Sequence, residues 1–100
     1  MCKVKAKIGR KKVVLQTIGY RGKKEAKTTI GDLRQARAFI AYKKDSKGLR
    51  VGSTKTVRVA GKKIKVKVKK WSRGSRLLLP KQDRPLKGIS AKRLRRAVVR

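Results

Sequence analysis

The feature that most constrains the fold is a run of alternating lysine and aliphatic residues in the second half of the chain. Residues 62–70 read KKIKVKVKK, with apolar Ile64, Val66 and Val68 between Lys63, Lys65, Lys67 and Lys69. Because successive side chains of a β-strand point to opposite faces, this period of two predicts a strand with one apolar and one cationic face. The lysine ammonium groups would project from one side at roughly 6.6 Å intervals.

The same alternation predicts two β-hairpins. Before the lysine-rich strand, Val57 and Val59 alternate with Thr54, Thr56 and Arg58, and Ala60-Gly61 indicates a tight turn. Near the N-terminus, residues 3–8 (KVKAKI) alternate in the same way, residues 9–11 indicate a turn, and residues 12–18 read as a second strand. Each hairpin is expected to bury one face and to expose a basic one.

Between the hairpins the apolar spacing becomes helical. Leu33, Ala36 and Ile40 follow Asp32, a residue type that caps helix N-termini. We predict a helix over about 32–43 that covers one face of the sheet, and a short last strand at 77–79. The predicted class is α+β: a small, mostly antiparallel β-sheet or barrel of two basic hairpins with one covering helix. The pattern leaves the choice between an open sheet and a closed barrel open.

The charge balance indicates the kind of partner. The chain has 34 Lys and Arg against 4 acidic residues, a formal net charge of +30, yet 38% of its residues are hydrophobic. A small core can form, because the excess of Lys and Arg takes the place of acidic and neutral polar residues and not of hydrophobic ones. The surface repels itself unless anions cover it, so we expect marginal stability in dilute buffer and a polyanionic partner, with nucleic acid the best fit.

Several other classes of protein are disfavoured by what the sequence lacks. There is no His, one Cys and no close pair of carboxylates, so we expect no enzyme, no cofactor, no metal site and no small-molecule substrate. No apolar run approaches the roughly 18 residues of a membrane span, and the N-terminal stretch lacks the apolar core of a secretory signal. We therefore expect a cytoplasmic location without membrane contact.

The candidate RNA-binding residues are cations of the basic strand face, the loops and the C-terminal segment, with two aromatic residues beside them. A row of lysines can follow a phosphate backbone, arginine forks bind phosphates and stack on bases, and aromatic rings stack on unpaired bases. For Trp71, capping of the sheet core is the alternative. The predicted site comprises Lys11, Lys12, Tyr20, Arg21, Lys23, Lys24, Lys63, Lys65, Lys67, Lys69, Lys70, Trp71, Arg73, Arg76, Arg84, Lys92, Arg93, Arg95, Arg96 and Arg100.

The C-terminal segment differs in character from the rest. Residues 80–88 contain both prolines and predict an extended linker, and Ser90 can cap a short helix with Leu94, Ala97 and Val98 on its apolar face. A helix of about ten residues with so many cations is not expected to hold alone in water. We predict a β-rich RNA-binding domain at 1–79 and a basic extension at 80–100 that becomes ordered on RNA or on a neighbouring protein.

A small β-rich core with a basic, proline-punctuated extension resembles the small archaeal ribosomal proteins. The resemblance covers the whole chain in composition and architecture, notably residues 64–70 and 88–100. It implies a structural constituent of the ribosome, more often of the large subunit, whose partners are ribosomal RNA and neighbouring ribosomal proteins, without homo-oligomers. The absence of Asn and the single Cys and Met are also typical of a hyperthermophilic source.

Two other functions fit the same composition. A small chromatin protein that coats double-stranded DNA would also combine a basic sheet with an exposed aromatic residue, and Trp71 would then serve as a minor-groove wedge. A ribosome-associated hibernation or assembly factor would occupy an RNA channel transiently. Competition between duplex DNA and structured RNA distinguishes the first alternative, and stoichiometric presence in salt-washed subunits distinguishes the second.

Overall fold

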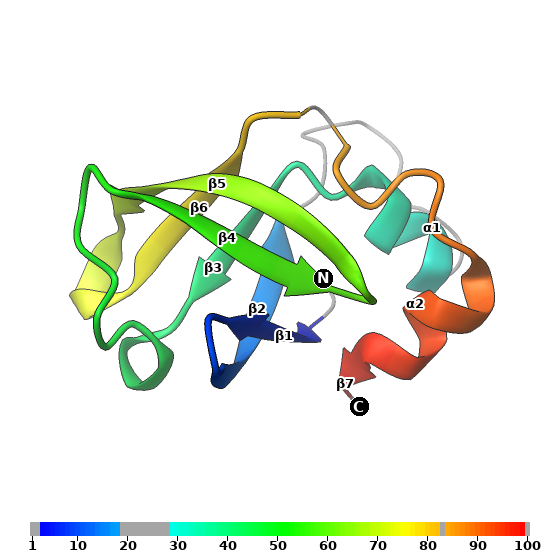
Figure 1. The fold of residues 1–100 in the computed structure, drawn as a ribbon, viewed down its shortest axis with the longest axis horizontal. Coiled ribbons are helices and arrows are strands. Elements are labelled where there is room, and N and C mark those ends of the chain that lie inside the picture. The colour runs from blue at the N-terminus through cyan, green and yellow to red at the C-terminus, as the bar shows by residue number, and fades with distance from the viewer. Residues whose placement is uncertain (1–2, 19–28, 83, 100) are drawn as a thin grey trace.

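The computed structural model describes residues 3–18, 29–82 and 84–99, and this part of the chain is mostly β (Figure 1). The first half contains β1 (Lys3–Ile8), β2 (Lys11–Ile18), α1 (Thr29–Gln35), β3 (Ala38–Ala41) and the 3-10 turn η1 (Lys43–Asp45). The second half contains β4 (Thr54–Val59), β5 (Lys62–Lys70), the 3-10 turn η2 (Ser72–Gly74), β6 (Arg76–Pro80), α2 (Ala91–Ala97) and β7 (Val98–Val99).

Six of the strands form a closed antiparallel barrel. The pairings run β1–β2–β3–β6–β5–β4, and β4 returns to β1 through Ala6–Val59, Lys7–Arg58 and Ile8–Val57. The short β7 continues the β4 edge of β1 by pairing with Lys3 and Val4. Closure removes the open edges of the sheet, and it answers the question between sheet and barrel that the sequence pattern leaves open.

Both predicted hairpins are confirmed. β1 pairs with β2 around Gly9-Arg10, and β4 pairs with β5 around Ala60-Gly61. Ala60 and Gly61 both have positive φ, 51° and 83°, as a two-residue hairpin turn of type I′ requires. The predicted strand at 77–79 is also present, as part of β6 between β3 and β5.

The inward-facing residues of the six strands fill the barrel. They alternate with exposed residues along β1, β4 and β5, and the larger ones are fully buried. The barrel core comprises Val4, Ala6, Val13, Leu15, Phe39, Ala41, Val57, Val59, Ile64, Val66, Val68 and Leu78. In a six-stranded barrel such side chains leave no channel.

The predicted helix over 32–43 is wrong in its extent. α1 ends at Gln35, and Ala38–Ala41 form strand β3 between β2 and β6, with all four residues buried. A segment buried on both faces lacks the alternation that marks a half-exposed strand, and Phe39 and Ile40 therefore extend the helical spacing of Leu33 and Ala36 by coincidence. The α+β class with a covering helix holds only in part, because the described fold is a β-barrel with two short helices.

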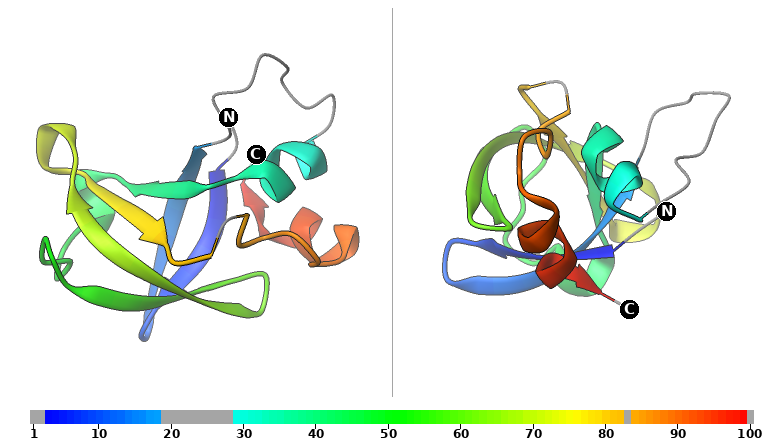
Figure 2. Two further views of the ribbon diagram at one scale, coloured as in Figure 1. Left: turned by 90° about the horizontal axis from the view of Figure 1, so that it is seen from above. Right: turned by 90° about the vertical axis from the view of Figure 1, so that its right-hand side faces the viewer.

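Both helices lie at the same end of the barrel (Figures 1 and 2). Leu33 of α1 and Ala36, which follows the helix, join Leu94 of α2 in the same buried cluster as the barrel interior. Leu86 and Ile89, which precede α2, belong to that cluster too. The segment after β6 thus packs on the barrel in this structure. The expectation that residues 80–100 become ordered on RNA concerns the free chain in solution, and it stays a prediction.

Candidate nucleic-acid interface

The outer surface of the barrel carries a row of four cations that cross four neighbouring strands. Lys12 of β2 is directly opposite Lys7 of β1, Lys7 is opposite Arg58 of β4, and Arg58 is opposite Lys63 of β5. All four residues are exposed. Neighbouring strands are about 4.8 Å apart, and like charges directly opposite each other destabilise a sheet. We call Lys12, Lys7, Arg58 and Lys63 the cross-strand row.

No carboxylate among the described side chains relieves this repulsion. Within residues 3–18, 29–82 and 84–99, none of the four cations makes an ion pair with an acidic side chain. Asp45 is the one carboxylate whose side-chain environment is described, and its Oδ2 is buried without a hydrogen-bond partner in that part of the chain. The described residues thus offer the cross-strand row no carboxylate counterion.

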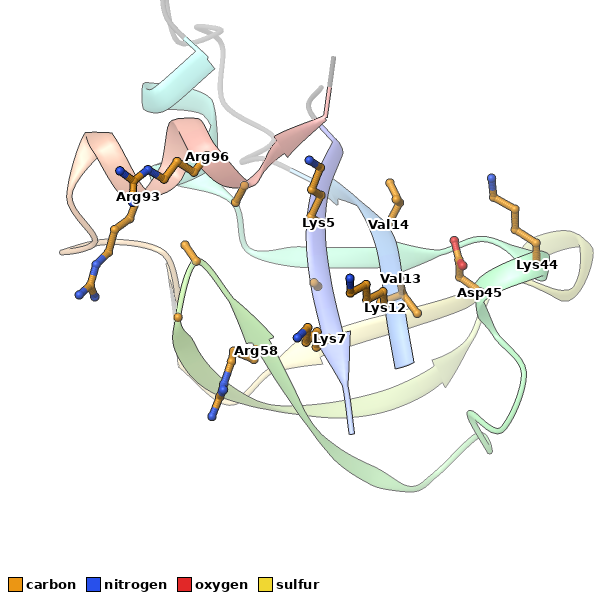
Figure 3. A pocket seen from close by; sticks show the side chains of 14 residues that line it. Lys5, Lys7, Lys12, Val13, Val14, Lys44, Asp45, Arg58, Arg93 and Arg96 are labelled. Carbon is orange, nitrogen blue, oxygen red and sulfur yellow. The ribbon is translucent and has the colours of Figure 1, made fainter. Parts of the chain in front are cut away.

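A groove lies between the cross-strand row and helix α2 (Figure 3). Its volume is about 920 Å³. Its cationic residues come from three strands, η1 and α2, and they are Lys5, Lys7, Lys12, Lys44, Arg58, Arg93 and Arg96. Small residues, Ala6, Ala60, Gly61 and Ala97, form part of its lining. Long basic side chains thus surround a surface that the backbone of a bound polymer can approach closely.

Helix α2 divides its four cations between two directions. Arg93 and Arg96, three residues apart, line the groove, whereas Lys92 and Arg95 do not. The helix is fixed by Leu94, which is fully buried, and by Ser90, whose Oγ accepts a hydrogen bond from the Arg93 backbone N–H at 3.4 Å. After the helix, β7 pairs with β1. These contacts fix the position of α2, and therefore the positions from which the Arg93 and Arg96 side chains extend.

Apart from Arg76 and Trp71, the predicted site residues fall into three groups. Lys12, Arg93 and Arg96 meet at the groove, and Lys63 extends the cross-strand row. Other exposed members are spread over the start of β2, the rest of β5, the loops and the other side of α2: Lys11, Lys65, Lys67, Lys69, Lys70, Arg73, Arg84, Lys92 and Arg95. Tyr20, Arg21, Lys23, Lys24 and Arg100 lie outside the described residues.

Arg76 has a structural contact of its own. It is half-buried, and its Nε donates a hydrogen bond to the Leu49 carbonyl at 3.1 Å. Lys62 behaves similarly, because its Nζ donates to the Pro85 carbonyl at 2.8 Å and so ties the C-terminal segment to β5. Not every cation of this chain is therefore equally free to bind phosphate.

Trp71 lies outside the barrel core. It follows β5, is 40% exposed and is followed by Ser72 and Arg73 of η2. Tyr42, at the end of β3, is 38% exposed, and the Lys3 Nζ lies 5.7 Å from the centre of its ring. Stacking of a base on either ring stays a prediction.

Lys5, Lys7 and Arg58 are groove residues that are missing from the sequence-based site. Their outward direction follows from the strand alternation of β1 and β4. Lys7 and Arg58 lie next to each other because β1 pairs with β4, which joins the first hairpin to the second. No local pattern in the sequence encodes that pairing.

Neither a membrane-spanning helix nor a cluster of metal ligands is found in the described part of the chain. No helix there combines the length and apolar composition needed to cross a membrane. No three Cys, Asp or Glu side chains there lie close enough together to bind a metal ion.

Comparisons with known proteins give no relative from which to transfer a function. No protein-family model, no curated protein and no solved structure matches the chain.

Proposed function

We propose that this protein is a structural, non-catalytic constituent of the ribosome that binds and neutralises ribosomal RNA. The observation that carries the proposal is the cross-strand row, in which three successive cross-strand pairs are cation against cation. A fold tolerates such repulsion when a polyanion supplies the counterions. The phosphates then neutralise the neighbouring cations, and the release of the counterions condensed on the nucleic acid favours binding.

RNA is favoured over a compact coat on duplex DNA by the distribution of the charge. Basic residues occupy the groove, the length of β5 and α2, so they cover several directions around the barrel. A protein embedded in folded RNA meets phosphates from several directions, whereas a protein that coats a duplex meets them from one. The resemblance to small archaeal ribosomal proteins points the same way.

Fractionation of ribosomes tests the proposal. An epitope-tagged copy in the native organism is followed by mass spectrometry through sucrose gradients after a wash in high salt. We expect one copy per ribosome in the large-subunit peak. Loss of the protein during the wash would instead indicate a transient factor, and its recovery with chromosomal DNA would indicate a chromatin protein.

The salt dependence of binding gives a second measurement on purified protein. If about ten cations contact phosphates, log affinity for structured RNA falls against log salt with a slope of about −7 to −9. A slope shallower than about −3 would contradict a role in neutralising ribosomal RNA.

A further inference from the structure

We propose that the part of the groove between α2 and strands β1 and β4 is a preformed site for the sugar–phosphate backbone of one RNA strand. This inference rests on the proposed function, because it assumes that RNA is the partner, and it assigns the contact to one place on the surface. The two walls are cationic: Lys7 and Arg58 on the barrel, Arg93 and Arg96 on the helix.

The arrangement of charge gives the site a direction. Asp45 and Lys44 lie at the end of the groove away from Arg93, as Figure 3 shows. A phosphate backbone is repelled by the Asp45 carboxylate and attracted by the α2 end, where the lining has cations alone among its charged residues. The RNA strand is therefore expected to run between α2 and the β4–β5 turn.

The floor of that passage is made of small residues. Ala60 and Gly61 form the β4–β5 turn, and Ala97 of α2 lines the same groove. A Cβ added to Gly61 would lie 4.0 Å from the Arg93 Nη1, so the guanidinium lies beside this turn. Small side chains let a ribose and its phosphates approach while the long basic side chains reach over them.

In this proposal, contrary to the expectation that residues 80–100 order on RNA, the helix wall is in place before RNA binds. Leu94 is fully buried, Ala97 is 7% exposed, and Val98 and Val99 pair with β1. Because these contacts already hold α2, binding does not require the ordering of the helix, which would otherwise reduce the affinity. This distinguishes the groove from the exposed cations in loops.

Two double variants of α2 test the site with the same loss of charge. R93Q/R96Q removes the two groove arginines, and K92Q/R95Q removes two cations that do not line the groove. Affinity of the full chain for a fluorescein-labelled RNA hairpin is measured by anisotropy over a series of KCl concentrations. Loss of two phosphate contacts makes the log–log slope shallower by about 2. We expect this change, with roughly tenfold weaker binding at 0.15 M KCl, for R93Q/R96Q. For K92Q/R95Q we expect less than about half of it.

A variant of the opposite wall keeps the test valid if R93Q/R96Q fails to fold by circular dichroism. K7Q/R58Q leaves α2 intact and is expected to give the same change of slope, because both walls contact the same strand. Hairpins of unrelated sequence should give the same result, since backbone contacts carry no sequence information.

Equal changes of slope for R93Q/R96Q and K92Q/R95Q would overturn the groove site while leaving RNA binding by the wild type, and so the proposed function, intact. Preference of the wild type for duplex DNA, lost in the groove variant, would overturn the assignment to RNA. No binding of RNA by the wild type would instead overturn the proposed function itself.

Discussion

At the scale of single residues, adjacent leucines of β6 have opposite environments. Leu78 is fully buried in the barrel, whereas Leu79 is 38% exposed and lies opposite Lys67. We predict that Leu78→Ala lowers the free energy of unfolding by about 2–5 kcal/mol, because it leaves a cavity in a closed core. The matched Leu79→Ala should cost less than about 1 kcal/mol. Urea unfolding measures both, and similar losses would contradict the inward direction of Leu78.

Lys7 lies between two cations, and this gives a prediction in which stability and binding change in opposite directions. Lys7→Glu replaces repulsion from Lys12 and Arg58 by attraction. The free energy of unfolding should rise by about 1 kcal/mol at low salt, since each cross-strand charge pair contributes roughly 0.2–1 kcal/mol. Affinity for an RNA hairpin should fall.

Lys69→Glu is the control for that change, because Lys69 is opposite Leu77 on β6 and gains no such pair with it. Urea unfolding at low and high salt separates the two variants. If Lys7→Glu were no more stable than Lys69→Glu, the register between β1 and β4 would be wrong.

At the scale of elements, the sequence predicts those strands that keep one face in water. The alternation in β1, β4 and β5 is visible because lysine, threonine or arginine marks each outward position. β3 has no such marker: Ala38 and Ile40 point outward yet are 7% and 8% exposed. Local periodicity contains no information about the chain segments that cover them.

The C-terminal helix gives the prediction at this scale. If α2 is formed without RNA, the Leu94 amide, which donates to the Ser90 carbonyl at 3.1 Å, should exchange its hydrogen slowly in the RNA-free protein. Ser90→Ala removes the side-chain cap, costs about 1 kcal/mol, and should speed exchange in the first turn about fivefold. Hydrogen-exchange mass spectrometry measures both. Unprotected exchange that becomes slow when RNA is added would show that residues 80–100 order only on RNA.

At the scale of the whole molecule, closure of the barrel brings together what the sequence keeps apart. The hairpins were predictable one at a time, but the β1–β4 and β3–β6 pairings that close the barrel join distant segments. The groove depends on the same closure, because Lys7, Arg58 and Arg93 come from separate thirds of the chain. Composition therefore predicts a polyanionic partner, whereas the proposed place of contact could be inferred only from the three-dimensional arrangement.

The net charge of +30 predicts how the stability of the RNA-free protein responds to salt. Repulsion between exposed cations is screened over about 10 Å at 0.1 M salt and over shorter distances at higher salt. Raising NaCl from about 0.05 to 0.5 M should therefore raise the Tm. Each kcal/mol of relieved repulsion adds about 4–8 °C for a chain of this size.

The variant Lys7→Glu, with less repulsion to screen, should show a smaller rise in differential scanning calorimetry. An RNA hairpin at about 100 times its Kd should add a further stabilisation of about 2.7 kcal/mol at low salt by mass action. A Tm that stays constant or falls with NaCl would mean that ion pairs, and not uncompensated cations, dominate the surface. Phosphates would then not be needed as counterions of this fold.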